Sequence, residues 1–357
     1  DFGFVYFNIV EKTKIKINKA EIELLEYIPD FYSIAEITNP LLSEMRPGIK
    51  TWVSEDVFEK MQVSIWIVND IRVNAFAKRY EGKNYIVLTI GLCVAFWKEV
   101  EEFIGNKNFR KVFHLSEEKE DSYKKELYQS MLNFIIAHEF GHIVHGHVLA
   151  NSEDNFIEEL YADETTNKDN WLTQLREFDA DYYAAMLNTA ITLGYWKEDR
   201  KVLSATFDLL FLSFYLCFDV FAKNSNRDFS NYQEKDIESY DHPYPGIRMY
   251  YCSIAICDLL IRIKGDNELI RELISSGFDA MISYEKRALG KEKYRDSYFS
   301  IAGTQKGAMH IRALVNGWNE LVDEYNRYSY VTIYKNDNVE SLSYFLGEDG
   351  EFLRQGV

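Results

Sequence analysis

Residues that interrupt helices are scarce in this chain, which has only five prolines and 18 glycines among 357 residues. Proline breaks helices and glycine favours turns, so a chain with few of both runs in long continuous elements. Long helices are therefore favoured over a sandwich or barrel of short strands, because such folds need many tight turns. The sequence instead predicts long helices over 90–104, 121–148, 171–193, 201–222, 242–263 and 305–328.

Three short runs before these helices are rich in β-branched and aromatic residues, at 63–68, 73–78 and 85–89. The last two are joined by Glu81-Gly82-Lys83-Asn84, a sequence typical of a turn. The three runs predict a small sheet, and the fold class is therefore α+β, mainly α. Further elements are expected nearer the start of the chain, with strands over 2–10 and 14–17 and a helix over 19–28.

The charge and the apolar stretches restrict the partners of the chain. Its formal net charge is −17 without a basic cluster, which excludes nucleic acid and anionic membrane surfaces. The stretch 202–222 has an uninterrupted apolar part only from Leu209 to Phe218, whereas a membrane span needs about 20 such residues. We interpret it as a buried core helix, so no membrane span is expected.

The cysteines and the start of the chain favour a cytoplasmic location. The cysteines lie in apolar surroundings without the spacing of a zinc ribbon, which predicts free thiols in a reducing compartment. The first residues do not resemble a signal peptide. The four cysteines are Cys93, Cys217, Cys252 and Cys257.

The most specific chemical pattern is Ile136-Ala137-His138-Glu139-Phe140-Gly141-His142. On a helix, His138 and His142 lie one turn apart, so both imidazoles can bind one metal ion while Glu139 lies beside its open position. The surrounding residues are apolar almost all round the helix, which indicates that it is buried. Burying these three polar side chains without a partner is costly, and a metal supplies the partner. The pattern therefore predicts one half of a zinc hydrolase site.

A third protein ligand must come from elsewhere, and two Glu-x-x-Ala-Asp segments compete, beginning at Glu159 and Glu177. Glu159 lies in an acidic stretch, 151–170, that we expect to be a loop and therefore a poor source of fixed ligands. Glu177 lies on a predicted helix whose small residues allow close approach to Gly141. We favour Glu177 and expect Asp181, one turn further on, to accept the outer N–H of a ligand histidine.

These segments together resemble the gluzincin peptidases that include the type I CAAX prenyl proteases, the bacterial membrane heat-shock protease and their soluble relatives. The matching segments occur in order, as Val73–Ala77 and Tyr85–Leu88 with Gly91-Leu92, His138–His142 with His147, Arg176–Asp181, and His242-Pro243 with Arg248. The resemblance implies a zincin-like catalytic domain over 61–263. An N-terminal region of unknown role, 1–60, and a C-terminal helical region, 264–357, flank it.

The resemblance also implies a site, with Zn²⁺ held by His138, His142 and Glu177 and with Glu139 as the general base. His242 and Arg248 are expected near the metal, where they bind substrate or stabilise the oxyanion. An edge strand of the sheet, 85–89, is expected to face the site. The further residues assigned to the site are Asn74, Ala75, Tyr85, Ile86 and Val87 for substrate binding, and Asp181, His145 and His147 as neighbours of the ligands.

A soluble zinc endopeptidase that cleaves extended segments of a protein or peptide is the leading hypothesis. The membrane relatives carry spanning helices between their ligand helices, where this chain has the polar stretch 151–170, so a prenylated substrate is not expected. The Gly146-His147 pair is also similar to Lit-type phage-exclusion peptidases, which implies a bacterial defence or toxin protease that cleaves one host protein. A metal hydrolase with a non-peptide substrate and an inactive zincin-like binding module remain alternatives. The oligomeric state stays open.

Overall fold

The structure is a computed structural model, and it describes residues 37–38, 40–43, 48–68, 70–106, 117–150, 156–158, 167–194, 200–224, 242–264, 267–287, 290 and 299–335. The elements expected over 2–10, 14–17 and 19–28, and the alternative ligand Glu159, lie outside these residues.

The described residues form an α+β fold that is mainly helical, as predicted. The helices are α3 (Glu55–Met61), α4 (Ile90–Gly105), the 3-10 turn η3 (Glu117–Lys119), α6 (Glu120–Val144), α7 (His147–Ala150), α8 (Asn167–Gly194), α9 (Arg200–Asn224), α10 (Pro245–Lys264), α11 (Asn267–Arg287), α12 (Phe299–Ala302) and α13 (Gln305–Tyr325). The strands are β1 (Val63–Val68), β2 (Ala75–Tyr80), β3 (Lys83–Thr89) and β4 (Phe156–Glu158).

The four strands form one sheet in the order β1-β3-β2-β4, in which β1 is parallel to β3 and the other pairs are antiparallel. A two-residue turn joins β2 to β3. Its residues Glu81 and Gly82 have φ values of 48° and 81°, as the twist of a tight hairpin requires. β4 comes from the acidic stretch for which we expected only a loop.

The prediction that 85–89 forms an edge strand is wrong. β3 is paired on both sides, so that Tyr85 lies opposite Ser64 of β1 and Lys78 of β2. Its last residues are buried, as in the central strand of a covered sheet. The backbone groups of Ile86 and Val87 are therefore engaged within the sheet, so Tyr85, Ile86 and Val87 do not offer a free edge for pairing with a substrate.

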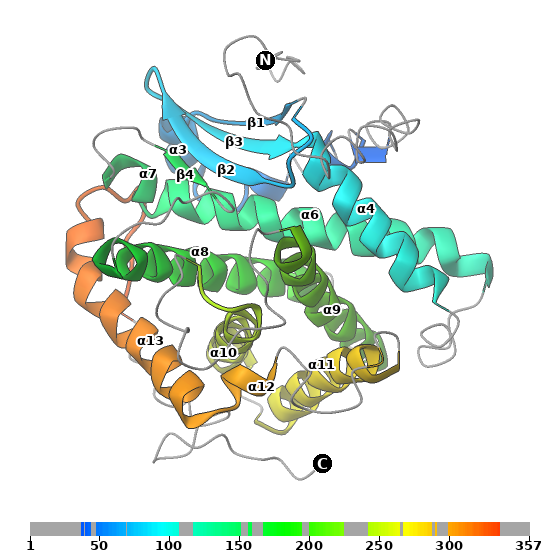
Figure 1. Ribbon diagram of the computed structural model, residues 1–357. Helices are drawn as coiled ribbons and strands as arrows, with labels where there is room; N and C mark the ends of the chain where they lie inside the picture. The colour runs from blue at the N-terminus through cyan, green and yellow to red at the C-terminus, as the bar shows by residue number, and fades with distance from the viewer. Residues whose placement is uncertain are drawn as a thin grey trace.

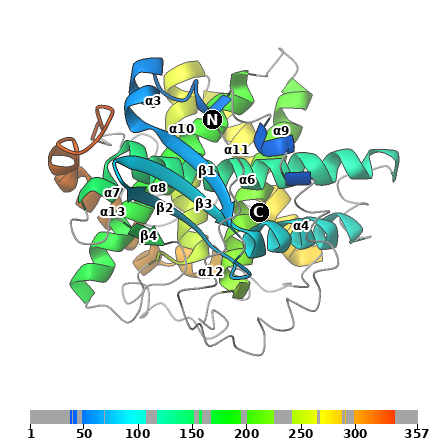
Figure 2. The same ribbon diagram turned by 90° about the horizontal axis from the view of Figure 1, so that it is seen from above.

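α6 lies between the sheet on one side and α8 on the other (Figure 1). Figure 2 shows the strands from above, lying over these two helices. Every residue from Phe134 to Val144 is buried. This sandwiched position explains why the sequence of the helix is apolar almost all round, and it places the motif in the centre of the fold.

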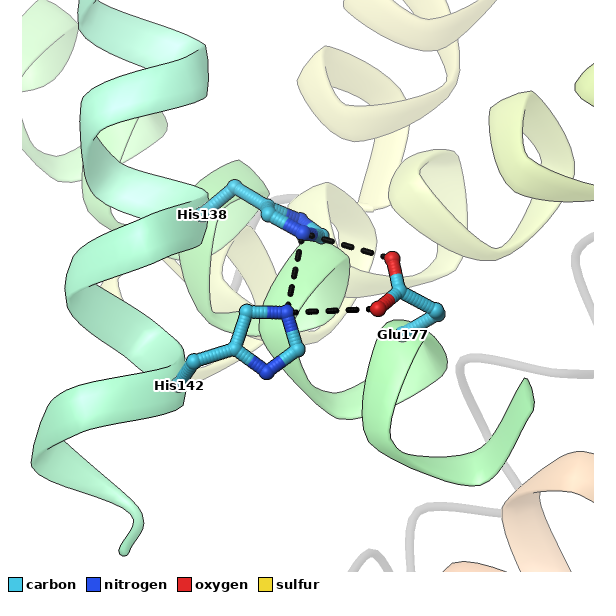
Figure 3. A group of neighbouring side chains, drawn as sticks. All are labelled: His138, His142 and Glu177. Atoms are coloured by element: carbon cyan, nitrogen blue, oxygen red, sulfur yellow. Dashed lines mark hydrogen bonds and ion pairs between the residues drawn. The ribbon is translucent and has the colours of Figure 1, made fainter. Parts of the chain in front are cut away.

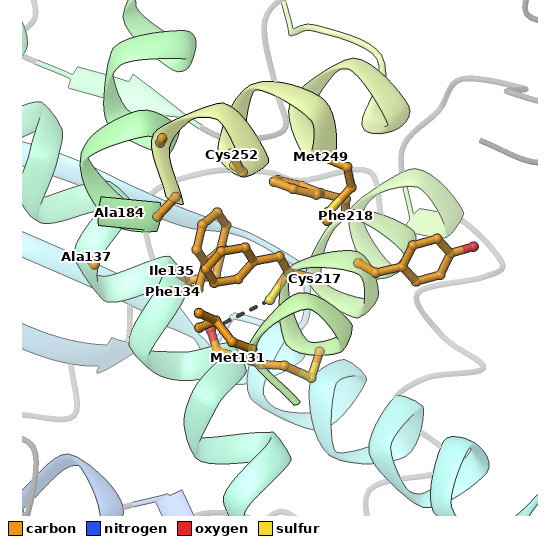
Figure 4. Close-up of a cluster of buried hydrophobic side chains, with 14 of the residues drawn as sticks. Met131, Phe134, Ile135, Ala137, Ala184, Cys217, Phe218, Met249 and Cys252 are labelled. Atoms are coloured by element: carbon orange, nitrogen blue, oxygen red, sulfur yellow. Dashed lines mark hydrogen bonds between the residues drawn. The ribbon is translucent and has the colours of Figure 1, made fainter. Parts of the chain in front are cut away.

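α9 is long and apolar enough to cross a membrane by length and composition, but 78% of its apolar stretch, within Val202–Asn224, is buried inside the protein. It packs against α6 and α11. Figure 4 shows Cys217 and Phe218 of α9 beside Phe134 of α6, with Cys252 of α10 close by. This burial is that of a core helix.

The helix expected over 121–148 stops earlier, because residues from far along the chain bind its end. The carbonyl of Val144 accepts hydrogen bonds from the backbone N–H of Tyr330 and the hydroxyl of Ser329, both at 2.9 Å. Gly146 then turns the chain with a φ of 78°, and a Cβ there would lie 2.5 Å from the backbone of Tyr328. Only glycine fits this turn, after which α7 begins at His147.

Candidate metal centre

His138, His142 and Glu177 converge in the centre of the protein from two helices (Figure 3). The two Nε2 atoms are 3.0 Å apart, and each is 3.4 Å from an oxygen of Glu177. A metal bound tetrahedrally at about 2 Å from its ligands separates the ligand atoms by about 3.3 Å. All three side chains are buried. Their spacing and burial are those of a metal site.

The hydrogen bonds on the outer sides of the two histidines support this assignment. His138 Nδ1 lies 2.8 Å from Asp181 Oδ1, and His142 Nδ1 lies 2.8 Å from His147 Nδ1. When both Nδ1 atoms donate, the Nε2 atoms present lone pairs toward each other and toward a carboxylate. Three electron-rich groups at this distance repel one another unless a cation lies between them, so the donor set fits a metal ion.

The close approach of α6 and α8 depends on small residues. A Cβ added to Gly141 would lie 3.3 Å from both the Cα of Ala180 and a ring carbon of Tyr183. The helices therefore meet at Gly141 and Ala180, as the sequence predicts, and Glu177 reaches the histidines from one turn earlier on α8.

Asp181 is hydrogen-bonded to three side chains from two helices, α6 and α10. Besides His138, it receives the Nε and Nη2 of Arg248 at 2.7 and 2.9 Å and the hydroxyl of Tyr251 at 2.6 Å. Burial opposes its charged form, but Arg248 and His138 outweigh burial and hold the pKa of Asp181 below its usual range. Arg248 is thus engaged with Asp181, and its Nη2 lies 3.8 Å from Glu177.

A second carboxylate, Asp179, lies on the outer side of His142, separated from it by His147. The sequence pattern did not predict a role for Asp179. Its Oδ2 is 2.5 Å from His145 Nδ1 and 3.3 Å from His147 Nε2. Burial opposes its charged form, yet the two histidines lower the pKa of Asp179 to about 2. Burial also lowers the pKa of His147, to about 3. The only sequence signal was its place inside the Glu177–Asp181 segment.

His242 lies near Glu177, and Glu139 is buried next to His138 in the sequence. His242 precedes α10, and its Nε2 lies 3.7 Å from Glu177 Oε2. Burial opposes the charged form of Glu177, but His242 and the two ligand histidines hold its pKa well below the usual range. Glu139 follows His138 on α6 and is only 1% exposed.

Asn74 and Ala75 lie where β2 begins. The backbone of Asn74 is bound to Thr89, but its amide is 1% exposed and has no hydrogen-bond partner among the described residues. Ala75 pairs with β3 on one side, and on the other side β4 reaches only as far as Phe76. The outer edge of β2 is therefore not covered by β4 at Ala75.

Comparison with known proteins identifies a family segment. Residues 52–161 match the model of peptidase family M48. The matched segment contains β1 to β3, α4 and α6, with His138, Glu139 and His142, and it ends before Glu177. No curated protein and no solved structure matches the chain.

Proposed function

We propose that this chain is a zinc-dependent endopeptidase that cleaves extended segments of proteins, and the match of residues 52–161 to the model of peptidase family M48 supports the proposal. The observation that carries the proposal is the buried set of ligand atoms from His138, His142 and Glu177, in which each imidazole Nε2 lies 3.0 to 3.4 Å from the other ligands. Two imidazoles and a carboxylate are the donor set that peptidases use for zinc. Zinc held there would polarise a peptide carbonyl and lower the pKa of a bound water to about 7.

The residues of the chain have separate tasks in this reaction. Glu139 takes the proton of the attacking water and passes it to the leaving amine. His242, near Glu177 at 3.7 Å, is the donor that we assign to the developing oxyanion. Arg248 is assigned to holding Asp181 and, through it, His138.

The start of β2 is the substrate-binding edge that we propose in place of β3. An extended peptide pairs with a strand through backbone hydrogen bonds, and this pairing depends on conformation more than on sequence. The amide of Asn74 offers a donor and an acceptor without a partner among the described residues. We therefore expect unfolded or loop segments as substrates, and the free, buried cysteines support a cytoplasmic location.

The test is cleavage of an unstructured protein, with metal analysis of the purified enzyme. Glu139→Gln keeps the three ligands, so the variant should bind zinc and fold normally while its kcat falls by about 10² to 10⁴. A variant that cleaves as fast as the wild type would remove the general base from the mechanism. Zinc binding without cleavage of any unstructured protein would favour a hydrolase with a non-peptide substrate.

A further inference from the structure

We propose that Asp179 is a positioning residue for the ligand His142 and that it acts through His147. The inference rests on the proposed function, since it takes His142 as a zinc ligand. The three side chains form a continuous chain of contacts, from His142 Nδ1 to His147 Nδ1 at 2.8 Å and from His147 Nε2 to Asp179 Oδ2 at 3.3 Å.

Only one direction of hydrogen bonding fits this chain of contacts. A zinc ligand uses the lone pair of His142 Nε2, so the proton of that ring is on Nδ1 and is donated to His147. His147 accepts with Nδ1 and therefore carries its own proton on Nε2, which faces Asp179. A carboxylate can only accept, so Asp179 fixes the tautomer of His147, and His147 fixes that of His142.

The surroundings of His147 exclude water, so water cannot take the place of Asp179 beside its Nε2. His147 is completely buried, and the rings of Trp318 and Tyr325 from α13 pack edge-on against it, with centroids 5.4 and 5.0 Å away. An N–H at this position has to be satisfied by protein. Asp179 Oδ2 lies within ion-pair distance of this nitrogen, at 3.3 Å, and the same oxygen is 2.5 Å from His145 Nδ1.

Both ligand histidines are thus connected through their Nδ1 atoms to a carboxylate of α8. His138 reaches a carboxylate of α8 directly, and His142 reaches another carboxylate of the same helix through one intervening ring. α8 therefore supplies the third ligand, Glu177, and also both groups that orient the first two. The turn at Gly146 makes this possible, because it brings His147 back against His142.

The test is the zinc affinity of Asp179→Asn, measured by competition with a chromophoric chelator. The amide loses the charge and can present its NH₂ to His147, so affinity should fall by about tenfold to a hundredfold. Asp179→Glu keeps the carboxylate and should recover part of the loss. Asn188→Ala is the matched control, because Asn188 is buried on the same helix and, among the described residues, its amide donates to the backbone of Ala184.

Two readouts separate positioning from general loosening of α8. Asn188→Ala should leave zinc affinity unchanged, and an equal loss in both variants at equal stability would overturn the proposal. Ring ¹⁵N shifts of the zinc-loaded wild type should place protons on His142 Nδ1 and His147 Nε2. Asp179→Asn should mix the His147 tautomers, and unchanged tautomers would also overturn it.

The outcome for the wild type distinguishes the two proposals. A wild type that binds no zinc contradicts the proposed function itself. A wild type that binds zinc, together with Asp179→Asn binding it equally well, contradicts only the role of Asp179.

Discussion

Glu177 is the residue on which the metal centre depends most, because two imidazoles from one helix leave a tetrahedral ion open on two sides. Glu177→Gln preserves the shape of the side chain but removes its charge. We expect zinc affinity to fall by more than about a hundredfold, since even partners of ligand histidines are worth tenfold to a hundredfold. Chelator competition measures the loss. Glu159→Gln is the control, and a loss of metal there but not at Glu177 would move the third ligand into the acidic stretch.

Some of these residues could be predicted from spacing and others could not. The one-turn separation of His138 and His142 is visible in any helical pattern, and the small residues of α8 indicated Glu177. Asp179 could not be found in this way, because its role depends on the turn at Gly146, which a continuous helical pattern conceals. The resemblance predicted that Arg248 lies near the site. It did not predict that the side chain of Arg248 binds Asp181.

The contact between α6 and α8 sets the position of the third ligand. An alanine at Gly141 would place a Cβ 3.3 Å from Ala180 and Tyr183. We expect Gly141→Ala to push α8 outward and to lower zinc affinity severalfold. Its unfolding free energy should change little, because alanine favours the helix by about 1 kcal/mol and offsets the strain. Chelator competition and urea unfolding measure the two quantities.

Gly277→Ala provides the matched control on α11, far from the ligands in sequence. A Cβ there would collide with the ring of Phe211 on α9. The overpacking should cost about 1 to 3 kcal/mol of stability while zinc affinity stays unchanged. The prediction for Gly141 fails if both variants lose stability alike and neither changes its zinc affinity.

At the level of elements, the sequence predicted the helices better than the sheet. The bounds of α4 and α9 follow directly from their apolar patterns. The end of α6 was predicted too late, because its cap comes from Ser329 and Tyr330, which no local pattern reveals. The order of the strands was also missed, since alternation along β3 shows that it is a strand but not which strands lie beside it.

For the whole molecule, the proposed zinc should act as a structural link, because its three candidate ligands come from both α6 and α8. A ligand that binds only the folded state stabilises it by about 4 kcal/mol when its free concentration is about 1,000 times Kd. Chelation should therefore lower the unfolding temperature, as measured by scanning calorimetry. Glu177→Gln should unfold at one temperature with and without zinc, and a wild type that behaves in the same way would contradict the prediction.

The hydrogen bond from Ser329 to Val144 joins residues 185 positions apart in the chain. During synthesis on the ribosome, the motif helix emerges long before the segment that caps it and closes the turn at Gly146. The nascent polypeptide therefore lacks the finished arrangement around His147 until translation has passed residue 330. The proposed metal centre is therefore completed only after nearly all of the described fold has been made, so the proposed activity would begin late in synthesis.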